Sequence, residues 1–115
     1  NGQLTGLGGC FVRKAKTAAA YSFYALAGQS VPKPGLVRVA DGAGARIEVE
    51  VWRLPPAGFG AFVALIPPPL GIGTVMLDDG TAAKGFLVEP IGIEGATDIS
   101  HLGGWRAYLK TLAPA

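Results

Sequence analysis

A run of three prolines followed by two glycines at a spacing of two constrains the fold of this chain most strongly. The run reads Ile66-Pro67-Pro68-Pro69-Leu70-Gly71-Ile72-Gly73-Thr74-Val75. Each proline fixes φ and removes a backbone donor, so the segment is predicted to form neither helix nor central strand. Glycine lets other groups approach the backbone closely. We therefore expect a rigid apolar turn that forms one wall of a small-molecule pocket, although the pattern is also typical of a simple tight turn.

The composition indicates one folded domain that spans residues 1–115. Half of the residues are hydrophobic and only 16% are charged, which argues against disorder and gives enough apolar surface for a single core. The 18 glycines and 9 prolines exceed average usage and favour a fold rich in turns and strands.

Charge and cysteine content exclude several classes of function. The net charge of +2 is too small to suggest a nucleic-acid partner, and the one basic cluster, Arg13-Lys14-Ala15-Lys16, is expected to be a solvated surface turn. A single cysteine, Cys10, allows no internal disulfide and no metal-site spacing, and we expect a buried structural thiol. No apolar run approaches ~20 residues and no secretory signal is visible, so we expect no membrane partner and a cytoplasmic location.

Alternation and turn signals predict an α+β domain. Strands are expected at residues 21–26, 36–39, 46–54, 75–77 and 82–88, and helices at residues 57–66 and 104–112. The turn at 41–44 is expected to join the second and third strands as a hairpin, and Ser100 is expected to cap the last helix. These elements predict a small, mixed, curved β-sheet or partial barrel with two short helices.

Glu50 can be interpreted either as a solvated outer carboxylate or as an acid that points into a pocket. Glu48 and Glu50 lie two apart on a strand, so they share a face, while Ile47 and Val49 point to the other face, which should be the core. From spacing alone a solvated outer carboxylate is favoured over a pocket acid, because charged groups are rarely buried unpaired.

Three basic residues are further candidates for anion binding or for structural ion pairs. Lys33 lies between two prolines, either in a surface turn or as a fixed charge at a pocket rim. Arg106 can fork to a ligand carboxylate, or it can form a structural ion pair with Asp98 or Glu89. Lys84 is expected to pair with Asp79 across a hairpin. Sequence context supports no serine nucleophile.

Several segments, taken together and in order, resemble the C-terminal domain of allophanate hydrolase, within the γ-glutamylcyclotransferase-like superfamily. The resemblance covers nearly the whole chain. It is carried by Asn1-Gly2-Gln3-Leu4, by Thr17, Ala18, Tyr21 and Tyr24, by Lys33-Pro34-Gly35, Glu48-Val49-Glu50-Val51-Trp52 and Pro69-Leu70-Gly71-Ile72-Gly73, and by Lys84-Gly85-Phe86, Asp98-Ile99 and Gly104-Trp105-Arg106-Ala107-Tyr108-Leu109.

The resemblance implies decarboxylation of N-carboxycarbamate, a small dianion that an amidase step of urea breakdown produces. It implies a loop at residues 1–4 and an amidase or urea carboxylase protein as a partner, and we expect neither a cofactor nor a metal. Glu50 or Tyr24 would manage the proton. The substrate-binding residues would be Asn1, Gln3, Leu4, Lys33, Leu70, Gly71, Ile72, Gly73 and Arg106. The alternative is a non-catalytic small-anion binding or assembly module that retains the fold.

Three departures from the family pattern limit what the resemblance implies. No amidase domain is visible, so we expect a stand-alone relative or an excised domain. The family is expected to carry a histidine upstream of residues 1–4, and the chain begins at Asn1. The turn at Pro67 to Gly71 holds no acid, so γ-glutamylcyclotransferase activity is rejected.

Overall fold

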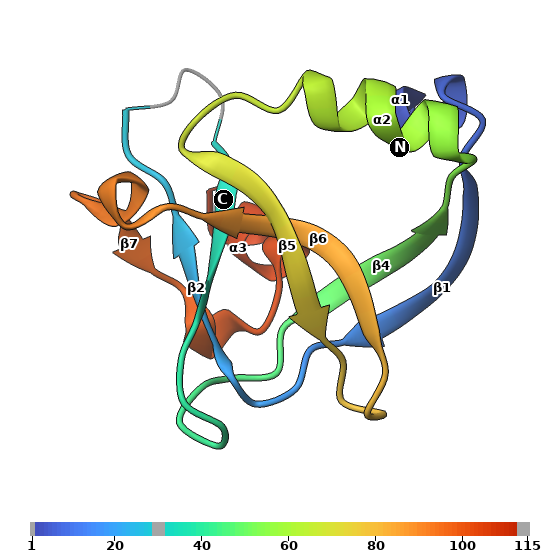
Figure 1. The fold of residues 1–115 in the computed structure, drawn as a ribbon. Coiled ribbons are helices and arrows are strands. Elements are labelled where there is room, and N and C mark those ends of the chain that lie inside the picture. The colour runs from blue at the N-terminus through green and yellow to red at the C-terminus, as the bar shows by residue number, and fades with distance from the viewer. Residues whose placement is uncertain (1, 29–31, 113–115) are drawn as a thin grey trace.

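Three small antiparallel sheets wrap around one core to form an open, barrel-like α+β domain in the computed structural model (Figure 1). The structure describes residues 2–28 and 32–112. The strands are β1 (Cys10–Lys16), β2 (Tyr21–Ala25), β3 (Pro34–Arg38), β4 (Glu48–Arg53), β5 (Leu70–Met76), β6 (Ala82–Val88) and β7 (Thr97–Asp98). The α-helices are α1 (Gly2–Gly6), α2 (Pro56–Ala64) and α3 (Trp105–Leu112), and the 3-10 helices are η1 (Pro90–Ile93) and η2 (Ser100–Leu102).

The strands pair as β1–β4, β3–β2–β7 and β5–β6. Single bridges join the sheets, from Thr17 to Leu77 and from Tyr21 to Ala45. In Figure 1 the long β1–β4 and β5–β6 pairs curve around the core, and α1 and α2 lie along one end of it. The predicted α+β class and barrel-like curvature are confirmed, with α1 in addition to the two predicted helices.

Two segments predicted as irregular are regular elements. The expected loop at the N-terminus is helical from Gly2, and its end is held by Gly9 N–H, which donates to the Leu4 carbonyl at 2.8 Å. The basic cluster at residues 13–16 lies on β1 rather than in a turn. Cys10 begins the same strand and is exposed, so the expectation of a buried thiol was wrong.

The turn at residues 41–44 does not make a hairpin. β3 pairs with β2 and β4 pairs with β1, so the turn connects two different sheets. The loop is pinned to the start of β2 instead, because Gly42 and Gly44 both donate to the Ala19 carbonyl and Ala45 donates to Tyr21. The approach is close: a Cβ at Gly44 would lie 2.2 Å from the Tyr21 nitrogen.

The glycine segment after the prolines is a strand, which corrects the expectation of exposed glycine backbone in a turn. β5 begins at Leu70, directly after Pro69, and pairs with β6 from Leu70–Val88 to Met76–Ala82. Glycine retains its N–H, so the ladder continues once the prolines end. Gly73 lies opposite Gly85, and a Cβ at Gly73 would lie 2.6 Å from Leu87 Cδ1.

The C-terminal helix packs against the core through its aromatic residues. Trp105 meets Phe23 edge-on at 6.2 Å between ring centroids, and Tyr108 packs against the same core. Leu109 and Leu112 of this helix are 42% and 52% exposed. Ser100 does not cap α3. It lies in η2, where its hydroxyl accepts a hydrogen bond from the Phe23 N–H at 2.8 Å.

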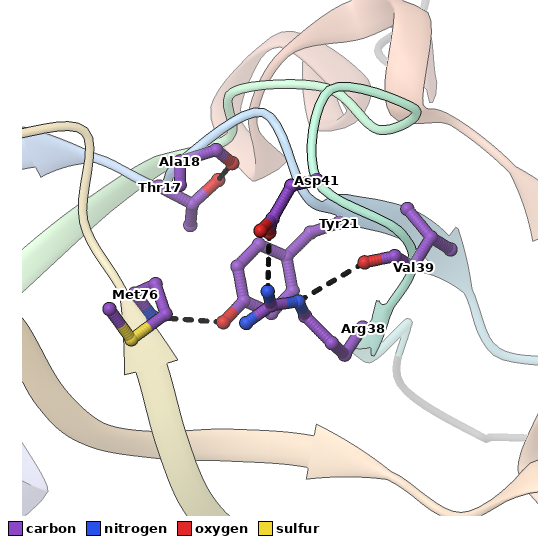
Figure 2. A network of polar contacts seen from close by, with 7 residues as sticks. All are labelled: Thr17, Ala18, Tyr21, Arg38, Val39, Asp41 and Met76. Atoms are coloured by element: carbon purple, nitrogen blue, oxygen red, sulfur yellow. Dashed lines mark hydrogen bonds and ion pairs between the residues drawn. The ribbon is translucent and has the colours of Figure 1, made fainter.

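Two buried hydroxyls, those of Tyr21 and Thr17, form hydrogen bonds at the centre of the fold (Figure 2). The Tyr21 hydroxyl accepts a hydrogen bond from Met76 N–H at 2.8 Å, and the Arg38 guanidinium lies 5.7 Å from the centroid of the Tyr21 ring. The Thr17 hydroxyl accepts from Ile47 N–H and donates to the Ala18 carbonyl, both at 2.9 Å. Thr17 and Tyr21 are each 0% exposed.

Replacing Tyr21 by Phe tests this junction. The Met76 N–H would lose its hydrogen-bond acceptor in a partly buried position, so we expect Tyr21→Phe to lower the free energy of unfolding by about 1–3 kcal/mol. Urea denaturation followed by circular dichroism measures the change. Tyr108→Phe is the matched control and should change stability by less than about 0.5 kcal/mol. Equal stability of the two variants would contradict the role given to the Tyr21 hydroxyl.

Candidate functional site

A cavity of about 790 Å³ lies between the β1–β4 and β5–β6 pairs. Its wall is mostly apolar and includes Val49 and Val51 from β4 and Phe59 and Phe62 from α2. The core residues that it reaches come from β2, β3, the segment before β4, and the end of β5 with Leu77 after it. Phe62 meets Phe86 of β6 at 5.4 Å between ring centroids, so α2 and β6 are in contact beside the cavity.

Glu50 forms a polar cluster on β4. The Trp52 indole N–H donates to Glu50 Oε1 at 3.1 Å, and Arg106 Nη2 lies 3.7 Å from Glu50 Oε2. Lys14 is the register partner of Glu50 on β1, so the two side chains share a face. The Glu50 side chain is 39% exposed and that of Arg106 is 71% exposed, so water and small anions can reach both.

Arg106 forms its ion pair with Glu50. The structural pair with Asp98 or Glu89 that the sequence suggested is not formed among the described residues. The reason lies in how α3 begins. Glu48 N–H donates to the Gly103 carbonyl at 2.7 Å, which fixes the chain just before α3 beside the start of β4. Arg106 therefore comes next to a carboxylate that is more than 50 residues away in the sequence.

Some of the predicted binding residues line the cavity and others do not. Leu4 and Ile72 both line the cavity, and Glu50 borders it as well. Gln3 is exposed on α1, and Asn1 lies outside the described residues.

The remaining predicted binding residues do not line the cavity. Leu70, Gly71 and Gly73 are partly buried in β5, and Lys33 lies just before β3, where its carbonyl accepts from Leu26 N–H at 2.9 Å. Their binding roles stay predictions.

Tyr24 and Glu50 are not brought together. Tyr24 lies in β2 opposite Gly35 on one side and Asp98 on the other. Its neighbour Phe23 lines the cavity, and side chains alternate along a strand, so Tyr24 points to the opposite face. Of the two predicted proton-managing residues, Glu50 is the one beside Arg106.

Lys84 donates to the Thr74 hydroxyl at 2.9 Å and does not pair with Asp79, as had been expected. Asp79 instead accepts from Thr81 and forms an ion pair with Arg13 at 3.1 Å. Hydrogen bonds from Thr81, with a smaller contribution from the Arg13 charge, hold the pKa of Asp79 below its ordinary value of 3.8. The Arg13–Asp79 pair ties the β5–β6 turn to β1.

Within residues 2–28 and 32–112, no three His, Cys, Asp or Glu side chains gather in a way that could hold a metal ion. Over the same residues, no helix has the length and apolar character needed to cross a membrane.

Comparison with known proteins assigns the family. The model of the allophanate hydrolase C-terminal domain matches residues 1–110. The chain belongs to the family of allophanate hydrolase C-terminal domains. It is 42% identical over 113 residues to urea amidolyase of Saccharomyces cerevisiae and 37% identical to that of Lachancea kluyveri. Each alignment covers 96% of this chain and 6% of the relative, so the chain spans a small part of these proteins.

Solved structures agree with this family. The chain superposes on the Kluyveromyces lactis urea amidolyase with a TM-score of 0.91 at 39% identity, covering 97% of this chain and 7% of that one. The match to Kluyveromyces lactis allophanate hydrolase has the same TM-score and covers 19% of that chain. The uropathogenic E. coli-specific protein c4763 matches with a TM-score of 0.85 at 37% identity, and 84% of its chain is covered.

The sequence of this allophanate hydrolase C-terminal-like domain predicts Trp52 beside Glu50, because a residue two positions away on a strand lies on the same face, and the indole hydrogen bond confirms it. Sequence reasoning missed Lys14, since its position depends on the β1–β4 register, and β1 was not recognised as a strand.

Asp98 gives a pH-dependent prediction for the strand beside Tyr24. Hydrogen bonds from Ser100, whose N–H lies 2.8 Å from Asp98 Oδ1, lower the pKa of Asp98 from its ordinary value of 3.8. A lowered folded-state pKa stabilises the fold above the unfolded pKa, and the contribution is lost as pH falls through the folded value. Asp98→Asn should therefore cost about 0.5 kcal/mol at pH 7, a small value because exposed charges are screened by solvent.

The cost of Asp98→Asn should shrink as the pH falls below the ordinary pKa of 3.8 and through the lowered pKa of Asp98. Urea unfolding of both proteins between pH 7 and pH 2.5 measures it. A difference in unfolding free energy that stays constant over this range would show that the Asp98 charge does not contribute.

Proposed function

We propose that this domain removes carbon dioxide from a small carbamate-type dianion, N-carboxycarbamate, after an amidase step in urea breakdown. One observation carries the proposal within the family: the Glu50 carboxylate is held between the Trp52 indole N–H and the Arg106 guanidinium on an accessible face. This arrangement offers a cation for a substrate carboxylate and an acid–base group beside it.

Arg106 and Lys14 would bind the dianion. The guanidinium of Arg106 can form two parallel hydrogen bonds to a carboxylate, and Lys14 lies across from Glu50 on the neighbouring strand. At 3.7 Å and 71% exposure of the arginine, the contact with Glu50 is weak enough for a substrate carboxylate to replace it. The dianion then lies beside the Glu50 carboxyl group.

The proposed step breaks one C–N bond of the substrate. Carbon dioxide leaves, and the electron pair of that bond stays on nitrogen. The nitrogen takes the proton from the Glu50 carboxyl group, which gives carbamate and a Glu50 carboxylate that recovers its proton from water. Arg106 stabilises the carboxylate that remains on the product. Glu50 fits this role better than Tyr24 does, because Tyr24 points away from the cavity and has no described contact with Arg106.

The substrate would come from an amidase. The structures matched include an allophanate hydrolase of which this domain covers 19%. An amidase or a urea carboxylase protein is therefore the proposed partner of this domain. Sequence context supplies no serine nucleophile for cleaving the amide itself.

A non-catalytic small-anion binding or assembly module is the second candidate. It is favoured by the exposure of the Arg106–Glu50 pair, since sites that stabilise a developing charge usually exclude water. It is also favoured by the position of Lys33, which does not line the cavity with Glu50.

A coupled assay tests the proposal. Carbon dioxide release is followed from allophanate plus an amidase that makes N-carboxycarbamate, with and without this chain. We expect the chain to accelerate release, and Glu50→Gln to lower that acceleration about 100-fold or more, since the proton donor is lost. Arg106→Ala should lower it about 10-fold to 100-fold through loss of a charge-assisted contact.

Lys110→Ala, on the same helix as Arg106, is the matched control and should leave the acceleration unchanged. The chain without the amidase should release no ammonia from allophanate. No acceleration by a folded chain that still binds malonate would reject catalysis and leave the binding module. Acceleration that survives Glu50→Gln would keep the enzyme and exclude Glu50 as its proton donor.

A further inference from the structure

The cavity has the wrong character for a small dianion. Its volume of about 790 Å³ falls in the range that encloses drug-sized ligands. Its wall is built from aliphatic and aromatic side chains, among them Val51, Phe62 and Ile72. A dianion with two carboxylates would lose its hydration there without enough donors to replace it. The cavity is suited instead to an apolar group.

Helix α2 points to the same conclusion. Its sequence, Pro-Ala-Gly-Phe-Gly-Ala-Phe-Val-Ala, is apolar on every face, yet none of its residues is buried. A helix that is apolar all round is normally surrounded by other apolar groups. Here Phe59 and Phe62 line the cavity, so α2 covers a space and not a packed core. An apolar ligand in that space would supply the packing that the helix lacks.

The charge at the cavity favours an anionic ligand group at Lys84. Lys84 lines the cavity, is exposed, and donates to the neutral Thr74 hydroxyl. The ion pairs found among the described residues are Arg13–Asp79, Arg38–Asp41 and Arg106–Glu50, so no described carboxylate neutralises Lys84.

The other charged residues that line the cavity are Glu48, Glu50 and Arg53. The two glutamates have Lys16 and Lys14 as register partners, so each already faces a cation.

We propose that the cavity binds an apolar monocarboxylate, with its hydrocarbon or aromatic body between α2 and the two strand pairs and its carboxylate at Lys84 and Thr74. This site adjoins the Glu50–Arg106 cluster, because Glu50 and Trp52 line the cavity, whereas Arg106 does not. It holds a second class of ligand whether or not the domain is a decarboxylase.

Calorimetry with decanoate and with the neutral alcohol decanol tests the proposal, at concentrations below those at which either probe self-associates. We expect one decanoate to bind per chain. Lys84→Gln should weaken decanoate binding about fivefold, as expected for an exposed charge-assisted contact, and should leave decanol binding unchanged. Ile72→Trp, which adds bulk at the cavity wall, should weaken binding of both probes at least about tenfold.

The matched controls are Lys110→Gln, an exposed lysine on α3, and Leu65→Trp, an exposed leucine just after α2 that does not line the cavity. Both should bind like the unchanged chain.

Absence of saturable decanoate binding, or Ile72→Trp binding as well as Leu65→Trp, would overturn the proposal. If Ile72→Trp does not fold, the Lys84→Gln comparison decides. An equal effect of Lys84→Gln on both probes, or on neither, would overturn the proposed site.

Discussion

The buried hydroxyls of Thr17 and Tyr21 are the contacts on which the rest of the fold depends. Two of the three sheets are two-stranded pairs, which are marginally stable in water on their own. Thr17 holds the end of β1 to Ile47 before β4 and to Leu77 after β5, while Tyr21 holds the start of β2 to Met76 in β5. The Tyr21 hydroxyl joins β2 to β5, and the Thr17 hydroxyl continues the β1–β4 pairing to Ile47, so the loss of either hydroxyl would leave a buried or partly buried N–H without its acceptor.

This junction places two different chemical environments on one small domain. The β1–β4 pair carries Glu50 and Trp52 on its outer face, and the hydrogen bond between Glu48 and Gly103 brings α3 and Arg106 to that face. The β5–β6 pair and α2 border the apolar cavity, whose wall includes Val49 and Val51 of β4 and also Glu50 and Trp52. The proposed sites for a small anion and for a larger apolar ligand therefore adjoin each other at β4.

Local signals predicted much of this fold, and contacts between distant residues account for most of what they missed. Period-two alternation predicted β4, and the strands expected at residues 75–77 and 82–88 predicted the β5–β6 hairpin but missed the part of β5 that begins at Leu70. β1 was not predicted as a strand, because its outward residues are charged and its partner strand β4 lies more than 30 residues away in the sequence. The partners predicted for Ser100, Lys84 and Arg106 were also wrong. In each case the nearest candidate partner in the sequence was not the nearest one in space. The resemblance identified the family and singled out Glu50 and Arg106, but not their contact.

The location of the anion site is the central claim for function, and nuclear magnetic resonance tests it most directly. Malonate, which carries two carboxylates on one carbon, is titrated into the ¹⁵N-labelled chain while the two tryptophan indole N–H signals are followed. The account predicts a saturable shift of the Trp52 indole signal, because malonate that binds Arg106 displaces the Glu50 carboxylate to which that N–H donates. The shift should be absent in Arg106→Ala. A stationary Trp52 signal, with saturable shifts around Lys33 or Gly71 instead, would contradict it and place the anion near the start of β3 or of β5.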